Sequence, residues 1–179
     1  MVEMLIVVRH AVAVDRADWT GDDLLRPLTP QGRQQAEGLV LRLQGHPIER
    51  ILSSPALRCS QTVEPLARRR LVPVEPFAPL GLDVPTEELL EELWRDDLHD
   101  VVLCAHGETI GEVLTLLSAD GHHGTESPQW PKGSTWLLQR LPQREVRGTY
   151  LPPPAAEPDL APGETPQTGD RVGGARATP

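Results

Sequence analysis

The stretch MLIVVRH, residues 4–10, carries the first sign of both a fold and a site. Five apolar residues in a row, three of them β-branched, lead directly into Arg9 and His10. The stretch VVLCAHGET, residues 101–109, repeats this arrangement and leads into His106. Apolar runs without alternation are typical of strands that are buried on both faces, as in a parallel sheet. We therefore expect two buried strands that each end on a histidine.

The rest of the chain adds strands and helices in alternation. Shorter strands are predicted at residues 50–54 and 134–141, and another at 71–77, whose prolines restrict it to a sheet edge. Strands that alternate with helices predict a parallel sheet. The fold class is therefore expected to be α/β, a three-layer sandwich with a mostly parallel central sheet and helices on both faces.

Four helices are predicted between these strands. One begins at Pro30 behind the N-cap Thr29. A second begins near Pro55 and should kink or end at Pro65, because proline lacks the N–H that a helix interior requires. A third is expected to be capped by Thr86, and the fourth directly follows His106.

Charge and composition exclude several classes of function. The formal net charge is −9, and a nucleic-acid backbone needs a basic surface, so we expect no nucleic-acid polymer as a partner. No apolar stretch approaches the length of a transmembrane helix, and the first apolar run is too short for a signal peptide, so we expect no membrane association. Cys59 and Cys104 suggest no disulfide framework, which fits a reducing compartment such as the cytoplasm.

The composition changes near the end of the chain. Residues 151–179 are rich in proline, glycine and alanine and contain almost no large apolar side chain. Such a segment cannot bury enough apolar surface to offset the entropy lost on ordering. We therefore expect one folded domain at residues 1–150 and a disordered tail at 151–179.

Polar side chains gather where the predicted parallel strands end. Arg9 and His10, residues 53–54, and His106 each follow a predicted strand. Ligands of open parallel sheets bind at the carboxyl ends of the strands, so we expect these side chains on one edge. Arg58 falls in the first turn of the next helix, where free backbone N–H groups also favour anions. The sequence therefore predicts an anion site with two histidines and at least two arginines.

The two histidines suggest chemistry as well as binding. A neutral histidine can attack phosphorus and carry the phosphoryl group, while arginines spread the charge on its oxygens without a metal. The second histidine can hydrogen-bond to the same oxygens. Two other classes stay open, namely a non-catalytic phosphate-binding or regulatory domain with the same pocket, and a metallohydrolase. No compact His/Asp ligand motif supports the metallohydrolase.

Each of these residues has a plainer interpretation when it is taken alone. A histidine at a strand end is more often structural than catalytic, and Arg58 would be an ordinary surface arginine of a helix. The two cysteines fit small packing residues, and His122 and His123 lie in a Gly/Pro loop that is typical of a solvated surface. The combination of residues and its order along the chain favour the catalytic interpretation.

Several segments, taken in order, resemble a known family. VVRHAVA (7–13), RPLTPQGRQQA (26–36), ILSSPALRCSQTVEPLA (51–67) and VVLCAHGET (101–109) are similar to the successive motifs of the histidine phosphatase (phosphoglycerate mutase-like) superfamily. Ala11 and the segment RPLT resemble the compact SixA-type phosphohistidine phosphatases. GDDLLRPLTPQGRQQAEGL and KGSTWLL are most similar to the C-terminal phosphatase-like domain of actinobacterial two-domain Nudix hydrolases.

The resemblance implies a mechanism and a substrate class. It implies that His10 is the phosphorylated nucleophile and that Arg9, Arg58 and His106 complete the phosphate pocket. It also implies a phosphatase that needs no metal or other cofactor. The substrate would be phosphohistidine on a partner protein or a small phosphoester, with a nucleotide as one option.

Two features bear on specificity. The stretch between residues 77 and 101 is too short for the insertions that build the sugar-phosphate pocket of the larger mutases, so we expect no mutase activity. Family members often take a general acid from this middle region, where this chain offers Asp83, Glu87 and Glu88. We choose Asp83 because its loop could reach the site. Arg26 and Lys132 are candidate substrate-binding residues, although a glycine turn that leads into a strand also explains the segment around Lys132.

Overall fold

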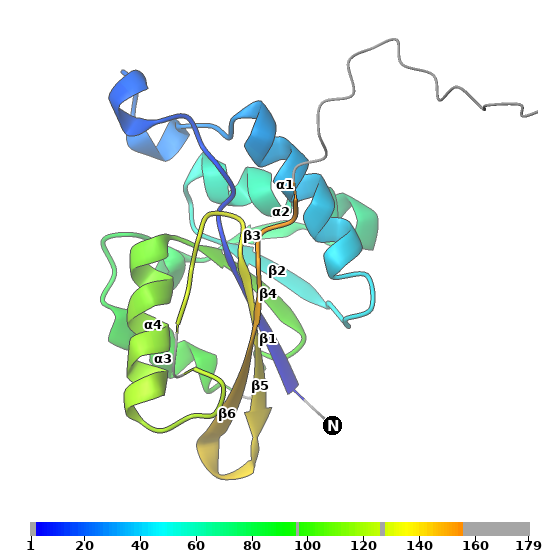
Figure 1. Ribbon diagram of the computed structural model, residues 1–179, viewed down its shortest axis with the longest axis vertical. Helices are drawn as coiled ribbons and strands as arrows, with labels where there is room; N and C mark the ends of the chain where they lie inside the picture. The colour runs from blue at the N-terminus through cyan, green and yellow to red at the C-terminus, as the bar shows by residue number, and fades with distance from the viewer. Residues whose placement is uncertain (1–2, 96, 126–127, 156–179) are drawn as a thin grey trace, which may run out of the picture.

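The central layer of the molecule is a six-stranded sheet (Figure 1). The computed structural model describes residues 3–95, 97–125 and 128–155. The strands are β1 (Glu3–Arg9), β2 (Arg50–Ser53), β3 (Val74–Pro76), β4 (Val101–Ala105), β5 (Thr135–Leu141) and β6 (Glu145–Leu151). Their order in the sheet is β3-β2-β4-β1-β5-β6, in which the first four are parallel and the last two join antiparallel. The sheet is mostly parallel, and β3 lies at an edge, as predicted.

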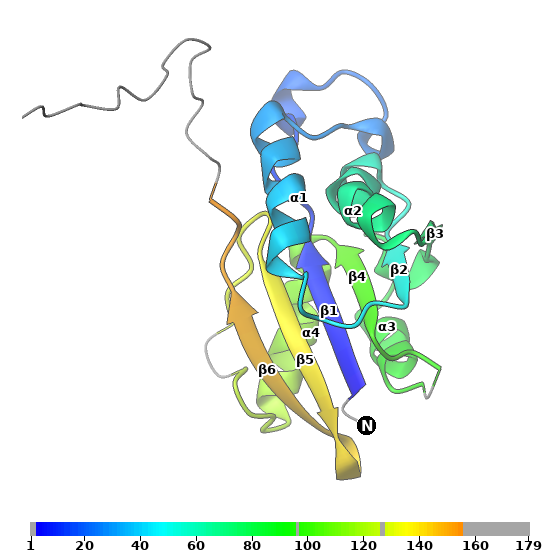
Figure 2. The same cartoon turned by 90° about the vertical axis from the view of Figure 1, so that its right-hand side faces the viewer.

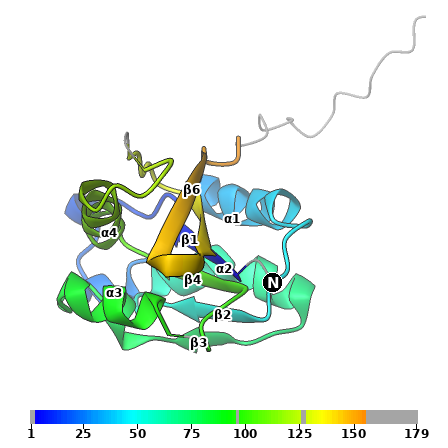
Figure 3. The same cartoon turned by 90° about the horizontal axis from the view of Figure 1, so that it is seen from below.

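Two helices cover each face of the sheet (Figure 3). On one face lie α1 (Pro30–Arg42) and α2 (Leu57–Arg70), and on the other lie α3 (Thr86–Leu93) and α4 (Gly107–Ala119). Single 3₁₀ turns are η1 (Arg16–Asp18), η2 (Asp23–Leu25), η3 (Ala78–Leu80) and η4 (Pro142–Arg144). This arrangement confirms the predicted three-layer α/β sandwich. Among the described residues, no helix is long and apolar enough to cross a bilayer.

Strand β1 shows why a continuous apolar run was needed. Leu5 and Val7 belong to the core beneath α3 and α4, whereas Ile6 and Val8 belong to the core beneath α1 and α2. Burial of each such side chain stabilises the fold by roughly 1.5–3 kcal/mol. The side chains of β4 alternate between the two cores in the same way. The two central strands therefore pack against the helices on both faces of the sheet.

The parallel strands bring separate segments of the chain to one edge (Figure 2). Strands β1, β2 and β4 point in the same direction, and His10, Ser54 and His106 follow them. The segment with η1 and η2, drawn in blue, lies beyond this edge. Strand β5 begins here as well, because it runs antiparallel to β1. Helix α1 starts as predicted, since the Thr29 hydroxyl accepts a hydrogen bond from the N–H of Gly32 at 3.1 Å.

Some local features differ from the prediction. Helix α2 continues through Pro65 to Arg70, so the option that it ends at the proline is wrong. Buried neighbours such as Val63 and Leu66 hold this part of α2 in the core. Thr86 is the first residue of α3 rather than its cap, and its hydroxyl bonds to Glu112 of α4. Strand β6 was not predicted.

The segment from residue 151 is only partly described. Leu151 closes β6, and Pro154 is buried beside Gly38 of α1, where a Cβ on that glycine would lie 2.6 Å from the proline ring. The folded part therefore extends to at least Pro154. The rest of the predicted tail, residues 156–179, lies outside the described residues.

Candidate active site

His10 follows β1 directly, and its side chain is buried. The backbone N–H of His10 donates to the carbonyl oxygen of Ala105 at 3.0 Å, which ties the end of β1 to β4. Its Nδ1 lies 2.8 Å from the carbonyl oxygen of Ala11, and a carbonyl can only accept, so Nδ1 carries the proton. The neutral ring therefore has its lone pair on Nε2. This is the tautomer that a nucleophilic Nε2 requires.

The surroundings of His10 keep its ring neutral. Burial is the main reason why the pKa of His10 falls from 6.5 to about 3. The hydrogen bond to Ala11 opposes this shift, and the positive charges of His106, Arg58 and Arg9 add to it. The ring of His10 is therefore neutral at neutral pH.

This shift predicts how stability depends on pH. The pKa of His10 is about 3 in the folded protein and 6.5 in the unfolded chain, so the unfolded chain binds the extra proton as the pH falls below 6.5. Between pH 7 and pH 5 the free energy of unfolding should fall by about 2 kcal/mol on account of His10. Urea denaturation of the wild type and of His10→Gln at both pH values measures this difference. The variant should lack this part of the loss, and equal losses would contradict the shift.

His106 and Arg58 meet His10 from β4 and α2. The ring centroids of the two histidines are 5.6 Å apart, with their planes at 64°. Arg58 is 2 % exposed, and its Nη2 lies 3.3 Å from Nδ1 of His106. The Nε2 of His106 lies 2.8 Å from the hydroxyl oxygen of Ser54, which follows β2. Three strand ends and one helix start therefore converge on one pocket.

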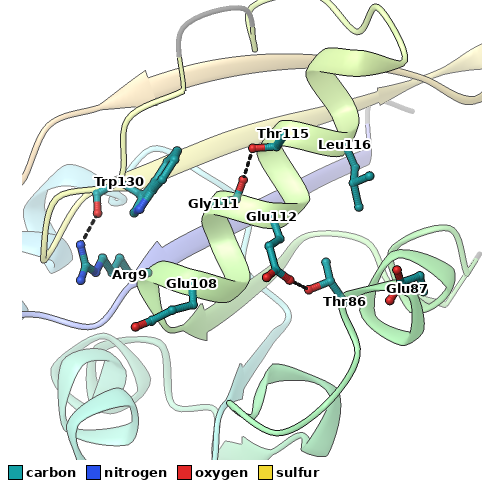
Figure 4. Close-up of a pocket in the computed structure, with 10 residues that line it drawn as sticks. Arg9, Thr86, Glu87, Glu108, Gly111, Glu112, Thr115, Leu116 and Trp130 are labelled. Carbon is teal, nitrogen blue, oxygen red and sulfur yellow. Dashed lines mark hydrogen bonds between the residues drawn. The ribbon is translucent and has the colours of Figure 1, made fainter.

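Arg9 reaches the same region from the side of α4 (Figure 4). Its Nη1 donates to the carbonyl oxygen of Trp130 at 2.6 Å. The guanidinium packs against Gly107, the first residue of α4, where a Cβ would lie 2.6 Å from Cζ of Arg9. A side chain at Gly107 would therefore displace Arg9.

Arg9 and Arg58 each have one buried guanidinium nitrogen without a hydrogen-bond partner among the described residues. The Nε atoms of Arg9 and Arg58 are buried and make no hydrogen bond within the described part of the chain. An unpaired buried donor costs about 1–3 kcal/mol. An anion with several acceptor oxygens, such as a phosphoryl group, would satisfy both donors. The geometry therefore fits the anion site expected from the sequence.

Comparisons with known proteins agree with this geometry. Residues 5–80 match the family model described as the histidine phosphatase superfamily (branch 1). The structure assigned as the phosphohistidine phosphatase SixA of Nakamurella multipartitia has a TM-score of 0.67 and 25 % identity, over 87 % of this chain and 98 % of that one. This chain belongs to the histidine phosphatase superfamily. A structure of SixA complexed with tungstate shares the fold, with a TM-score of 0.63 and 22 % identity over 83 % of this chain and 94 % of that one.

A curated relative from Mycolicibacterium smegmatis adds a second line of similarity. The 8-oxo-(d)GTP phosphatase of that organism is 32 % identical over 157 residues, which cover 84 % of this chain and 48 % of that protein. This chain therefore spans about half the length of the mycobacterial relative. An uncharacterized protein of a Picosynechococcus species is 35 % identical over 127 residues, covering 66 % of this chain and 76 % of that protein.

Asp23 is a residue beside Arg58 that the sequence interpretation missed. Its carboxylate lies 3.1 Å from Nη2 of Arg58 and 2.9 Å from Nε of Arg26, and its carbonyl oxygen accepts from Nη1 of Arg58 at 2.8 Å. Burial alone would raise the pKa of Asp23, but the hydrogen bond from Arg26 and the charge of Arg58 outweigh it and keep that pKa below its usual value. The ionised carboxylate therefore holds Arg58 in place.

The two candidate substrate-binding residues lie in different surroundings. Arg26 is enclosed, because its Nη1 also donates to the carbonyl oxygen of Val14 at 2.7 Å, so its side chain braces the segment before α1. Lys132 is half-buried in the turn before β5, and its backbone carbonyl accepts from Gln35 at 3.4 Å. Contact of either side chain with substrate stays a prediction.

The turn before β5 supports the backbone of Arg9 and His10. The N–H of Gly133 points at the carbonyl oxygens of Arg9 (3.2 Å) and His10 (3.1 Å), and the Ser134 carbonyl accepts from the N–H of Arg9 at 3.0 Å. Gly133 has a φ of +83°, a conformation that glycine adopts without strain. The segment KGSTW therefore has a structural role beside His10, and its Trp136 is part of the core.

Thr62 is a second residue that was missed. Its hydroxyl oxygen accepts from the N–H of Ala11 at 2.9 Å, and the hydroxyl donates to the carbonyl of Arg58 at 2.7 Å. Helix α2 is thereby linked to the residue next to His10. No local pattern marks such a threonine, because its partner lies 51 residues away in the sequence.

Asp83, which we chose as the general acid, is not among the acidic side chains that line the cavity beside Arg9. Asp83 is exposed in the loop before α3. Among the described residues, the carboxylates that line the cavity beside Arg9 are Glu87, Glu108 and Glu112 (Figure 4). The role of Asp83 as general acid stays a prediction that this arrangement does not support.

The cysteines pack next to the site. Cys59 and Cys104 are fully buried in the core beneath α1 and α2, and the Cys59 Sγ lies 3.8 Å from Nε2 of His106. Among the described residues, one group could hold a metal ion, formed by Glu49, His99 and Asp100 with ligand atoms within 4.8 Å of one another. These residues precede β2 and β4, so they lie at the sheet edge opposite the histidines.

Proposed function

We propose that this chain is a metal-independent phosphatase that works through a phosphohistidine at His10. The observation that carries the proposal is the neutral, buried His10 ring, with its lone pair on Nε2, close to the buried side chains of Arg58 and His106 and to the charge of Arg9. The end of β1 holds Arg9 and His10, the end of β4 holds His106 and the start of α2 holds Arg58, so their geometry is set before substrate arrives.

The proposed reaction has two steps. In the first step, Nε2 of His10 forms a bond to phosphorus while the bond to the leaving group breaks, and an acid protonates the leaving group. In the second step, water attacks phosphorus and the P–N bond breaks. The conjugate base of that acid takes the proton of the water, inorganic phosphate leaves, and His10 returns to its neutral form.

Arg9 and Arg58 would stabilise the charge on the phosphoryl oxygens through both steps. Fixed guanidinium groups in a buried pocket act on this charge much as a metal ion would. Arg58 can only donate, so the Nδ1 of His106 accepts from it and the Nε2 of His106 carries the proton that faces Ser54. Once substrate is bound, a phosphoryl oxygen would accept from this Nε2 in place of Ser54. The proposal therefore includes no metal.

Two substrate classes are supported by the relatives. Similarity to SixA favours phosphohistidine on a partner protein, and similarity to the mycobacterial 8-oxo-(d)GTP phosphatase favours a small phosphoester such as a nucleotide. Turnover of a phosphohistidine peptide and of nucleoside phosphates under the same conditions separates them. A non-catalytic phosphate-binding domain is the alternative function, and it would bind phosphate without turnover of either class.

We expect hydrolysis of p-nitrophenyl phosphate to continue unchanged in EDTA, because the arginines neutralise the phosphoryl charge. The measurement is the initial rate before and after dialysis against the chelator. If chelation abolished turnover and a divalent ion restored it, the metal-free mechanism would be wrong. No turnover with retained phosphate binding would favour the non-catalytic alternative.

A further inference from the structure

A groove lies along α4 beside Arg9 (Figure 4). It has a volume of about 740 Å³, and Arg9 and Gly107 are among the residues that line it. Glu108, Gly111 and Glu112 of α4 line its length, and Trp130 forms part of its wall. We call this feature the α4 groove. Since Arg9 lines the groove and follows β1 next to His10, the group bonded to a phosphoryl on His10 would lie at the Arg9 end of the groove.

The charge of the α4 groove is negative. Glu87, Glu108 and Glu112 contribute three carboxylates, all on exposed residues, and Arg9 is the cation among the lining residues. A phosphoryl group in the pocket would occupy Arg9. A leaving group that carries its own phosphates would then meet carboxylates without a cation, and like charges at such short range repel.

Trp130 adds a flat apolar surface to the groove. Its indole packs over Gly111, where a Cβ would lie 2.8 Å from the ring, and its carbonyl oxygen holds Arg9. Glycine destabilises a helix interior relative to alanine, and here it makes room for the indole. Gly111 lies four residues beyond Gly107, or about 6 Å along the helix axis. A planar leaving group one sugar away from the phosphorus could stack on this ring.

We infer that the α4 groove selects phosphomonoesters with an uncharged aromatic leaving group, and that it prefers nucleoside monophosphates to the corresponding di- and triphosphates. Carboxylates in the groove can accept hydrogen bonds from the N–H groups of a base, whereas they repel further phosphates. This inference rests on the proposed phosphatase function. It extends that function to the charge and shape of the substrate.

The test compares guanosine 5′-monophosphate, diphosphate and triphosphate as substrates in EDTA at constant ionic strength. Release of inorganic phosphate measures kcat/KM, and we expect at least a tenfold preference for the monophosphate over the triphosphate. In the double variant Glu108→Gln/Glu112→Gln, kcat/KM for the triphosphate should rise about tenfold. A gain for the triphosphate distinguishes removal of repulsion from loss of a proton donor, which could only slow a reaction.

Two controls make the result specific to the groove. The double variant Glu37→Gln/Glu145→Gln removes the same charge from exposed positions on α1 and β6, and it should leave the preference unchanged. Trp130→Leu should lower kcat/KM about fivefold for guanosine monophosphate and phenyl phosphate, relative to its effect on glycerol phosphate. A larger loss for the two aromatic substrates than for glycerol phosphate would show that the phosphate pocket itself is intact.

Failure of the inference can be told apart from failure of the proposed function. Turnover of triphosphate and monophosphate at equal rates, with no response to the groove variants, would overturn the inference alone. No turnover of any of these compounds or of p-nitrophenyl phosphate would overturn the proposed phosphatase function, and the inference with it.

Discussion

Replacing His10 by alanine is expected to abolish turnover and the covalent intermediate together. The variant should lose a factor on the order of 10⁴ or more in kcat, the scale seen when a nucleophile is removed. The reason is positional, because the neutral Nε2 of His10 lies in the pocket where Arg9, Arg58 and His106 converge. Arg9 and Arg58 have no lone pair for the attack, and the lone pair on Nδ1 of His106 faces Arg58, so none of these neighbours replaces Nε2 of His10.

The intermediate itself can be trapped. A phosphoramidate is labile in acid and survives base, whereas a phosphoserine does the reverse. Quenching in base during turnover, followed by mass spectrometry, should find the phosphoryl group on His10. A label on Ser53, Ser54 or Cys59, or wild-type turnover by His10→Ala, would refute the mechanism.

A matched variant shows whether the pocket survives the change. His106→Ala should slow the reaction by about 10²-fold but still allow phosphate to bind, because Arg9 and Arg58 remain. Phosphate binding by His10→Ala, measured calorimetrically, shows in the same way that the fold is intact. Loss of phosphate binding in both variants would indicate general damage to the pocket.

The position of the histidines could be predicted because two simple rules coincide. Strands β1 and β4 are apolar on both faces since helices cover both, so their sequences show continuous runs with abrupt ends. Parallel strands then place their carboxyl ends on one edge. His10 and His106, which are 96 positions apart in the chain, therefore have ring centroids 5.6 Å apart.

Strand β6 illustrates a part of the fold that local pattern does not show. Its sequence EVRGTYL places Gly148 at a buried position, and glycine is a poor strand former. The reason for the glycine lies in the packing, because a Cβ there would lie 3.0 Å from Thr125 and 3.1 Å from the ring of Trp136. Such a requirement becomes visible only after the elements are assembled.

Residues that hold the arginines were missed for a similar reason. Asp23 meets Arg58 over 35 positions of sequence, and the Trp130 carbonyl meets Arg9 over 121. Acidic and aromatic side chains in loops have many ordinary roles, so their residue type alone points to no partner. The catalytic groups could be listed from motifs, but the groups that orient them could not.

Replacing Arg58 by alanine should lower turnover by roughly 10²–10³-fold, the typical effect of removing one donor to a developing charge. Arg58 is almost fully buried, and its Nε has no partner within the described residues, so a phosphoryl oxygen is its natural ligand. Arg58→Lys should recover only part of the loss, because an ammonium cannot form the bidentate contacts of a guanidinium. Steady-state kinetics with p-nitrophenyl phosphate measures all three proteins.

A variant at Asp23 tests whether the orientation of the Arg58 guanidinium matters in addition to its charge. Asp23→Asn keeps the side chain's shape but removes the charge 3.1 Å from Nη2 of Arg58, so it should cost less than Arg58→Ala, about tenfold. Added guanidinium ion should restore part of the activity of Arg58→Ala, since the vacated space lies between Asp23 and His106. It should not help Asp23→Asn, whose guanidinium is still present. If Arg58→Ala folds and keeps wild-type turnover, Arg58 does not stabilise the phosphoryl charge.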